Sequence, residues 1–334
     1  ARRRSLTKGF VTAAENLAVH VPNALLPPVP SLVRRLPGWL DHWASLTAPR
    51  LDKTLAAIPG NRVDFLLTDT LFFPFIDRLL DIGKTIFRIP DSFSGFWGDN
   101  PALAQRERDL VASADLVVTS SYQVQERVAR EWEINIHYLP NGVDLGRYRV
   151  TAPEPPEYRR SPRHKAVYTG AVGWWFDDAL LRGAAAALPE WDFFIIGDSR
   201  RLKSHEKLTN IHLLGTREPN DCVAYQQHAD AGIIPFTGGG SELVDSINPL
   251  KLYEYLAAGI PVVTSRWSEL EQIGAPITMA DSVGEFVAGI ESSIPDSRER
   301  RRVRQEFAAR FDWSNIAERL LRMLSETDNR ADRQ

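Results

Sequence analysis

Short apolar runs alternate with amphipathic stretches along most of the chain, beginning near residue 62. In the first half, apolar runs of strand length occur at four places: 62–69, 84–91, 115–121 and 136–144. Amphipathic stretches of helix length lie between them, at 73–83, 101–114 and 122–132. Gly83 and Pro101 are typical of a helix end and a helix start. This order of strands and helices predicts a parallel sheet covered by helices.

The same alternation resumes after a segment rich in proline and charge. Residues 151–163 hold four prolines, which predicts an interdomain linker. Beyond the linker, five apolar runs predict strands: 165–173, 192–198, 211–215, 231–236 and 261–265. Four segments predict helices, at 177–189, 220–229, 249–258 and 313–326. A further strand and helix are expected before about residue 294.

We therefore predict an α/β protein with two Rossmann-like domains that face a cleft. The expected boundaries are 1–150 for the first domain, 151–163 for the linker and 164–312 for the second domain. A C-terminal helix and tail at 313–334 follow, with packing back on the first domain as one option. Ligands of open α/β sheets bind at the carboxyl ends of the strands, so the site is expected there.

Composition excludes several classes of protein. The chain has 334 residues, a net charge of −3, 43% hydrophobic and 25% charged residues, which is typical of a soluble globular protein without a nucleic-acid partner. Cys222 is the only cysteine, so neither an internal disulfide nor a cysteine-rich metal site can form. No apolar run approaches the roughly 18 residues of a membrane span, and no signal peptide is visible. A cytoplasmic protein is expected.

The stretch "NPLKLYEYLAAGIPVVTS" at 248–265 carries the first candidate chemistry. Asn248 is a good N-cap, Pro249 a good first helical residue and Gly259 a good helix stop. Lys251 then lies in the first turn, at N3, where its charge opposes the helix dipole unless it meets an anion. A helix N-terminus with a lysine predicts an anion site, and phosphate is its usual ligand.

Glu254 lies three residues after Lys251, on the same face of the predicted helix. Its carboxylate can accept hydrogen bonds from a ribose diol. Just upstream, "FTGGGSE" contains Gly238, Gly239 and Gly240, whose backbone N–H groups can approach a phosphate closely. Two simpler interpretations remain open: a surface pair at i,i+3 for Lys251 and Glu254, and a flexible loop for the glycines.

Several motifs together resemble one enzyme family. The stretch at 248–265 is similar to the donor-site segment of GT-B glycosyltransferases, the type found in glycosyltransferase family 4 and its relatives. Four more segments resemble that family in the expected order: "LPNGVD" (139–144), "YTGAVGWWFD" (168–177), "WDFFIIGD" (191–198) and the run at 208–236. The resemblance covers about residues 62–326.

The resemblance implies roles for individual residues. Glu254 matches the second glutamate of the family's E-x7-E motif, which binds ribose, and Lys251 would contact the pyrophosphate. The position of the first glutamate is Ser246 here, as in a subgroup with an N-P-x-K-x-Y-E variant, so retention or inversion stays open. Tyr253 and Tyr255 flank Glu254, and one of them could touch the base or sugar, although core packing is the simpler role.

The implied donor site needs no metal. The chain contains no D-x-D motif, and a GT-B site stabilises the leaving diphosphate with helix ends, glycine loops and basic side chains. Arg200 and Arg201 are weaker candidates for this role. The residues expected to bind the nucleotide donor are Lys251, Glu254, Gly170, Gly173, Gly238, Gly239, Gly240, Ser246, Asn248 and Tyr253. No cofactor is expected beyond the nucleotide-diphosphate sugar itself, with a UDP-sugar favoured.

A general base for the acceptor hydroxyl is expected at a strand end of the first domain. Asp91, in "FRIPDSFSGFWGD", resembles an acidic loop of related sugar transferases, and a turn-capping role is the alternative. Asp69 is the next candidate. Glu107 and Asp115 are expected to have structural roles. His20 and His42 are expected to lie on the surface.

The N-terminal region departs from the family pattern. No strand, glycine-rich loop and helix precede residue 60, so we expect the chain to begin after the family's first one or two βα units. A gene fragment is the favoured explanation, and a smaller natural fold is the alternative. The segment "LVRRLPGWLDHW" at 32–43 mixes Arg, Trp and Leu, which suits either a membrane surface or a helix covering the sheet.

The leading hypothesis is a metal-independent hexosyl- or glycuronosyltransferase of bacterial surface polysaccharide synthesis. Its partners would be a nucleotide sugar and a glycan or polyprenyl-linked acceptor, at the inner-membrane surface as one option. A non-catalytic nucleotide-sugar-binding or scaffold protein of the same fold is the alternative. A sugar-nucleotide epimerase is weaker, because Glu242 and Asp245 near the donor loop have no histidine beside them. A dinucleotide dehydrogenase lacks its G-x-G-x-x-G motif.

Overall fold

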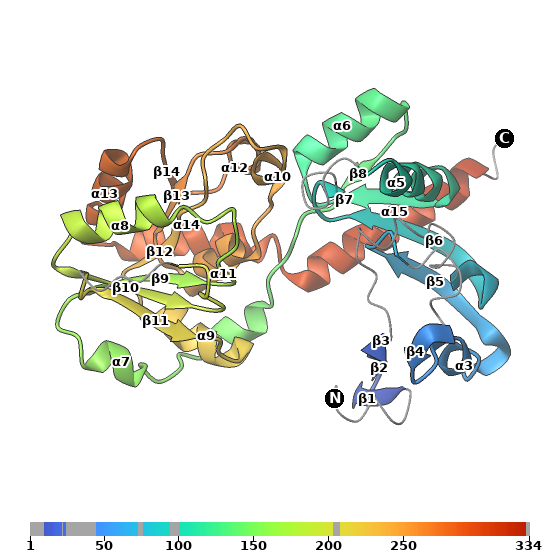
Figure 1. Cartoon of the computed structure of the whole chain (residues 1–334), viewed down its shortest axis with the longest axis horizontal. Coiled ribbons are helices and arrows are strands. Elements are labelled where there is room, and N and C mark those ends of the chain that lie inside the picture. Colours follow the sequence, from blue (N-terminus) through green and yellow to red (C-terminus); the bar gives the residue numbers. More distant parts are fainter. Residues whose placement is uncertain are drawn as a thin grey trace. The chain divides into compact units, whose positions relative to one another are not determined.

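A computed structural model describes residues 10–21, 23–24, 45–72, 76–93, 100–202 and 208–331. The chain divides into two compact units, which are described separately here (Figure 1). The first unit comprises residues 1–119, 124–138 and 326–334, and the second comprises residues 120–123 and 139–325.

The first unit is built on a four-stranded parallel sheet in the order β5-β6-β7-β8. Its strands are β5 (Arg62–Thr68), β6 (Asp81–Ile89), β7 (Leu116–Thr119) and β8 (His137–Tyr138). Two helices accompany them: α5 (Pro101–Ser113) and α6 (Tyr122–Trp132). The side chain of Asn100 caps α5 by accepting hydrogen bonds from the backbone N–H groups of Ala102 and Leu103. The core of this unit forms around Phe87, Ile89, Val117 and Val128.

Smaller elements precede this sheet. β1 (Val11–Ala14) and β2 (Leu17–Val19) form an antiparallel hairpin, and β3 (Asn23–Ala24) pairs with β4 (Thr47–Ala48). Short helices follow at α3 (Leu51–Leu55) and η2 (Pro59–Asn61). His20 is half-buried beside Phe10, with ring centroids 5.9 Å apart, which corrects its expected surface position. The segment 32–43 with His42 lies outside the described residues.

The predicted helix at 73–83 is wrong. Residues 76–78 form only the 3₁₀ turn η3 (Ile76–Arg78), and β6 already begins at Asp81. Gly83 lies inside this strand and does not end a helix. A Cβ at Gly83 would lie 2.6 Å from the carbonyl oxygen of Asp64 on β5, so the close approach of two strands requires the glycine. Residues 73–75 are outside the described part of the chain.

The second unit contains a six-stranded parallel sheet in the order β11-β10-β9-β12-β13-β14. Its strands are β9 (His164–Thr169), β10 (Trp191–Ile196), β11 (Ile211–Gly215), β12 (Ala231–Ile234), β13 (Val262–Ser265) and β14 (Thr278–Ala280). Every residue of β10, β12 and β13 is buried, as expected for strands covered on both faces. The order is that of a doubly wound sheet, with its switch point between β9 and β12.

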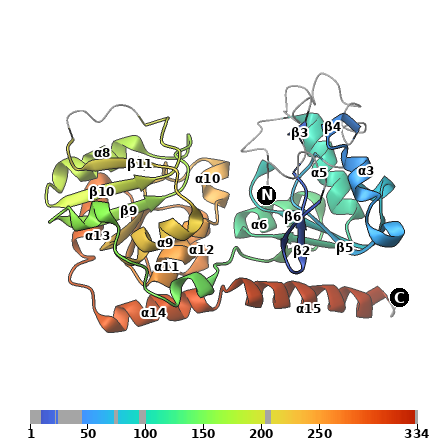
Figure 2. The same ribbon diagram turned by 90° about the horizontal axis from the view of Figure 1, so that it is seen from below.

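Helices cover both faces of this sheet (Figure 2). On one face α8 (Asp178–Ala187) packs against α13 (Val283–Glu291), and on the other α11 (Leu250–Ala258) packs against α9 (Pro219–Gln227) and α14 (Arg298–Ala309). The remaining helices are η4 (Leu145–Tyr148), α7 (Pro156–Arg159), α10 (Glu242–Ser246), α12 (Ser268–Ile273) and α15 (Trp313–Ala331). Across the described residues, no helix combines the length and apolarity that crossing a membrane requires.

The start of α11 differs from the expectation in one detail. Its N-cap is Pro249, so Lys251 is the second helical residue and Asn248 lies outside the helix. Asn248 is therefore not the N-cap of α11, and its Nδ2 donates to Glu269 Oε1 at 3.4 Å. Gly259 ends the helix in the left-handed conformation (φ 79°), which confirms the predicted stop. The helices α10, α12 and α14 were not predicted.

Candidate nucleotide-donor site

Backbone hydrogen bonds connect the carboxyl ends of β9, β10 and β11 in the second unit. The N–H of Gly170, after β9, donates to Ile196 O at 2.8 Å, and the N–H of Gly197, after β10, donates to Gly215 O at 3.0 Å. Gly170 (φ 137°) and Gly197 (φ 142°) both adopt backbone conformations that other residues avoid. A Cβ at Gly197 would lie 2.0 Å from Gly170 O, so only glycine fits there.

A pocket of about 470 Å³ opens over these strand ends. Its volume falls in the range of small-molecule sites. The first turn of α11 closes one side, and the residues after β11 close another. We call it the Lys251 pocket, and its lining residues are Thr169, Gly170, Ala171, Ile196, Gly197, Asp198, Thr216, Arg217, Pro219, Cys222, Leu250, Lys251 and Glu254.

Lys251 brings a cation to the point where the sheet meets α11. Its Nζ lies 5.0 Å from the ring centroid of Tyr168 and 4.9 Å from that of Phe236. Burial among these rings lowers the pKa of Lys251 to about 8, although the Glu254 carboxylate opposes the shift. A Cβ at Gly170 would lie 3.2 Å from Lys251 Cε, so the glycine leaves room for the lysine. An anion in the pocket would therefore restore charge balance around the ammonium group.

Glu254 is held by a buried hydrogen-bond network. Its Oε2 accepts from Gln226 Nε2 at 3.0 Å, and the same Nε2 donates to Thr169 Oγ1 at 3.0 Å. Gln226 Oε1 accepts from the Tyr148 hydroxyl at 2.6 Å. Gln226 is only 1% exposed, so the network fixes the Glu254 carboxylate in an oriented position before any ligand arrives. An oriented carboxylate can accept the two hydroxyls of a ribose.

Tyr253 and Tyr255 both lie in the core. Tyr255 is fully buried, and its hydroxyl oxygen accepts from the backbone N–H of Thr169 at 2.8 Å, which ties α11 to the end of β9. Tyr253 is also fully buried, with its ring centroid 4.7 Å from that of Phe311. Neither tyrosine lines the Lys251 pocket.

The glycine-rich loop does not join Lys251. Gly238 and Gly239 line a different pocket, at the ends of β12–β14, and the N–H of Gly240 donates to Asp245 Oδ2 at 2.9 Å. Ser246 is buried, with its Oγ donating to Leu243 O at 2.9 Å inside α10. These four residues therefore shape the chain around α10 and do not contact the Lys251 pocket.

Four further candidates also lie outside the Lys251 pocket. Asn248 is buried, and its carbonyl accepts from Asn141 Nδ2 at 2.7 Å. A Cβ at Gly173 would lie 2.4 Å from the ring of Trp175, so the packing of this ring requires a glycine. The Arg200 guanidinium is exposed, and its Nε lies 2.9 Å from Oδ1 of Asp198. Arg201, the next residue, is exposed.

In the first unit, the two candidate bases lie at neighbouring strand ends. Asp69 directly follows β5, and Asp91 follows β6 by two residues. Thr68, the last residue of β5, pairs with Phe87, which precedes Arg88 on β6. Burial lowers the pKa of Arg88, whereas the carboxylates of Asp69 and Asp91 raise it. The two acids proposed from the sequence therefore both interact electrostatically with Arg88. Arg88 itself was not predicted.

Two acidic residues of the first unit are structural, as expected. Glu107 is buried on α5, and its Oε1 lies 2.9 Å from Arg127 Nη2 on α6. Asp115 Oδ2 accepts from the backbone N–H of Thr85 at 2.7 Å, which links the start of β7 to β6.

Gly197 lines the Lys251 pocket and Gln226 holds Glu254, but neither residue was predicted. Gly197 could have been found, because "IIGD" repeats the strand-then-glycine pattern that identified Gly170. Gln226 gave no local signal, since it is one of two adjacent glutamines on a helix and its partners are far away in sequence. Within the described ranges, no cluster of three or more His, Cys, Asp or Glu residues could hold a metal ion.

Known proteins resemble this chain in both sequence and fold. The family described as Glycosyl transferases group 1 matches residues 164–296. The protein named "Putative teichuronic acid biosynthesis glycosyltransferase TuaH" from Bacillus subtilis (strain 168) is 22% identical over 275 residues, covering 75% of this chain and 69% of TuaH.

Solved structures show the same architecture. Sucrose-phosphate synthase from Thermosynechococcus elongatus superimposes with a TM-score of 0.71 at 14% identity, over 95% of this chain and 85% of the synthase. HepE from Anabaena, in complex with UDP and glucose, superimposes with a TM-score of 0.62 at 15% identity, over 83% of this chain and 81% of HepE. The chain thus has an α/β fold of the GT-B type, and residues 164–296 match the Glycosyl transferases group 1 family.

Proposed function

We propose that this chain transfers a sugar from a nucleoside-diphosphate donor to a glycan or lipid-linked acceptor in the synthesis of a bacterial surface polysaccharide. The observation that carries the proposal is the Lys251 pocket, in which a cation and an oriented carboxylate share one helix at the switch-point edge of a parallel sheet. The surface-polysaccharide context rests on the similarity to TuaH.

The donor would bind with its diphosphate at Lys251 and its ribose at Glu254. The first turn of α11 adds the partial positive charge of a helix N-terminus to that of the lysine. When the bond between sugar and diphosphate breaks, negative charge grows on the leaving phosphate, and Lys251 would stabilise it. The uridine base would occupy the far side of the pocket, near Thr216 and Arg217.

Uridine is the base that the comparisons favour, because HepE is described in complex with UDP and with UDP-glucose. The Cys222 thiol on the same side of the pocket is neutral, since burial raises its pKa to about 11. It would contact the nucleotide as a small apolar group, without nucleophilic chemistry.

The acceptor hydroxyl would lose its proton to an aspartate of the first unit. Asp91 and Asp69 lie at the strand ends of that unit, and both carboxylates interact electrostatically with Arg88. A carboxylate at a strand end can act as a general base if it reaches the acceptor hydroxyl. Which aspartate accepts the proton is a question for substitution.

Calorimetric titration of UDP, GDP, ADP and dTDP tests the donor site. We expect UDP to bind and Glu254→Ala to weaken it by about 1.5–3 kcal/mol, because a charged hydrogen-bond acceptor is lost. Glu306→Ala is the matched control, since Glu306 is exposed on α14 and lines no donor pocket. If no nucleotide binds to the folded chain, the proposed function is wrong.

Sugar transfer must then be shown separately. The protein is incubated with UDP-sugars in the presence and absence of a crude glycan acceptor. UDP should be released faster with the acceptor than by hydrolysis without it. Nucleotide binding without any transfer would favour a non-catalytic nucleotide-sugar-binding protein of the same fold.

A further inference from the structure

A second pocket, of about 560 Å³, lies at the carboxyl ends of β12, β13 and β14. Its helical walls are the first turns of α8 and α13, which cover the sheet face opposite to α9 and α11. We call it the Arg266 pocket, and its lining residues are Asp177, Ala179, Leu180, Phe236, Gly238, Gly239, Ser265, Arg266, Ala280, Asp281, Ser282 and Val283.

Phe236 lies between the two pockets. It lines the Arg266 pocket, and its ring centroid lies 4.9 Å from Nζ of Lys251, which lines the other pocket. The glycine loop that the sequence assigned to a phosphate forms another wall of the Arg266 pocket through Gly238 and Gly239. The two pockets are therefore neighbours at one sheet edge without sharing a lining residue.

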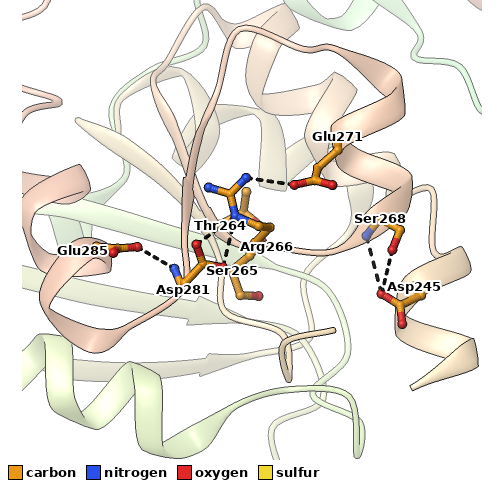
Figure 3. A network of polar contacts seen from close by, with 8 residues as sticks. All are labelled: Asp245, Thr264, Ser265, Arg266, Ser268, Glu271, Asp281 and Glu285. Atoms are coloured by element: carbon orange, nitrogen blue, oxygen red, sulfur yellow. Dashed lines mark hydrogen bonds and ion pairs between the residues drawn. The ribbon is translucent and has the colours of Figure 1, made fainter. Parts of the chain in front are cut away.

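Ion pairs hold the rim of the Arg266 pocket in place (Figure 3). Arg266 Nε donates to both oxygens of Asp281, at 3.1 and 2.9 Å, and its Nη1 donates to Glu271 Oε1 at 2.9 Å. The backbone N–H of Asp281 donates to Glu285 Oε2 at 2.8 Å. The guanidinium thus already has two carboxylate partners, and little of its charge remains for a ligand.

The glycine wall is also anchored. Asp245 Oδ1 accepts from the Ser268 hydroxyl at 3.3 Å, and Asp245 Oδ2 accepts from the N–H of Gly240 at 2.9 Å. This aspartate connects α10, α12 and the end of the glycine loop. The wall formed by Gly238 and Gly239 is therefore tied to the rest of the unit next to the pocket.

The interior of the Arg266 pocket combines an apolar floor with carboxylates. Leu180, Phe236 and Ala280 are buried and supply the apolar surface. Asp177 Oδ1 accepts from the backbone N–H of Leu180 at 2.8 Å as the N-cap of α8, which orients its carboxylate. Asp177 and Asp281 outnumber the one cation, Arg266, so the lining carries a net charge of −1.

This chemistry selects among ligands. Carboxylates only accept hydrogen bonds, so the ligand must bring donors. An anionic ligand would be repelled by the net negative lining and would find Arg266 already paired. A sugar ring offers hydroxyl donors along its edge and C–H surface on its face, which match the carboxylates and the apolar floor.

We propose that the Arg266 pocket binds an uncharged sugar residue of a glycan, as a saccharide site separate from the nucleotide pocket. The choice of a saccharide as ligand rests on the proposed function. The site itself does not depend on nucleotide binding, because the two pockets have separate linings.

Saturation-transfer NMR on the full chain tests this with glucose, N-acetylglucosamine and glucuronate as probes. Saturation of glucose or N-acetylglucosamine should persist in excess UDP, and glucuronate should give a weaker signal. Ala179→Trp should abolish the signal by filling the pocket, because Ala179 is exposed at its wall. Retained UDP affinity in this variant shows that the unit is folded.

Asp177→Asn is the milder variant. Asparagine is an equally good N-cap, so α8 keeps its start, but an amide replaces the carboxylate. We expect about tenfold weaker binding of the neutral sugar, the difference between charged and neutral hydrogen bonds. Asp221→Asn, which changes an exposed aspartate in the first turn of α9, should leave it unchanged.

The outcomes separate this inference from the proposed function. UDP binding without any saccharide signal would overturn the sugar site and leave the donor site standing. A saccharide signal that UDP displaces, or that Ala179→Trp leaves intact, would place the probe elsewhere and also overturn it. A stronger signal from glucuronate would refute the assigned ligand class. Failure of both UDP and saccharides to bind would remove both proposals.

Discussion

The two parallel sheets of this chain end in very different edges. In the second unit, glycine-mediated hydrogen bonds join β9, β10 and β11, and Gln226 holds Glu254 from within the core. In the first unit, Asp69 is exposed and Asp91 is half-buried. A nucleotide is the constant part of a sugar donor, so a rigid preformed pocket suits it. Under the proposed function, a base that must meet an acceptor can remain more open.

Replacing the proposed general base in the first unit should have the largest effect, which is on kcat. It should leave nucleotide binding by the second unit unchanged. We expect Asp91→Asn to lower kcat by about 10²–10⁴-fold, the usual contribution of a general base, with unchanged UDP affinity. Asp69→Asn is the parallel variant, and Asp64→Asn, at an exposed position on β5, is the control. Turnover within about twofold of wild type in both variants would show that neither aspartate is the base.

A methyl group at Gly197 tests the rigidity of the strand ends in the second unit. We expect Gly197→Ala to reduce the free energy of unfolding by about 2–4 kcal/mol, because the residue has positive φ and its Cβ would overlap Gly170 O. Gly238→Ala is the matched control, since a Cβ there meets no atom within 4 Å. Chemical denaturation measures both, and equal stabilities would mean that the strand ends are not locked.

Gln226 and Gln227 offer a neighbouring pair of tests. Gln226→Leu removes the partner of Glu254 and should cost about 1–3 kcal/mol of stability together with about tenfold in UDP affinity. Gln227→Leu removes hydrogen bonds to Ala152 and Val150 instead, so stability should fall while UDP affinity stays. Equal UDP affinities in the two variants would show that the network does not orient Glu254.

The pH dependence of UDP binding should be the smallest effect. The pKa of Lys251 is lowered to about 8 in the free protein, and a bound diphosphate favours the charged amine. Affinity should therefore fall as pH rises above about 8, by up to tenfold per pH unit. Lys251→Arg stays charged and should show a flat profile from pH 7 to about 9.5. A flat profile in the wild type would contradict the role of the lysine.

The same shift predicts the effect of pH on the stability of the free protein. Because the folded-state pKa lies below the unfolded value, the unfolded chain binds more protons between about pH 8 and 10.5. The unfavourable contribution of Lys251 is therefore complete below about pH 8 and disappears as pH rises through this window. Lys251→Met should abolish this part of the stability profile in denaturation experiments.

The sequence predicted the second unit well because its strands are continuous apolar runs. The strands β10 and β13 are buried along their whole length, so their composition marks them without help from distant residues. The segment before β6 was misjudged, because "IDRLLDIG" has the apolar spacing of a helix but pairs with β5 from Asp81 onward. Strand pairing, which is not local, overrode the helical pattern there.

The candidate site was predictable only where one element carries it. Lys251 and Glu254 share a helix, so their spacing placed both at one pocket. The direction of the glycine loop depends on Asp245 and on the strands beneath it, and the loop turned away from Lys251. Gln226 and Arg88 reach their partners through tertiary packing and left no pattern in the chain.

The most direct test of the donor site compares UDP with uridine. If Lys251 holds the diphosphate, Lys251→Ala should weaken UDP by about 10–100-fold and change uridine by less than about twofold. If Glu254 holds the ribose, Glu254→Ala should weaken both ligands by similar factors. Calorimetry on the wild type and the two variants gives all six affinities. Equal losses of uridine and UDP in Lys251→Ala would contradict the assignment of the lysine to the diphosphate.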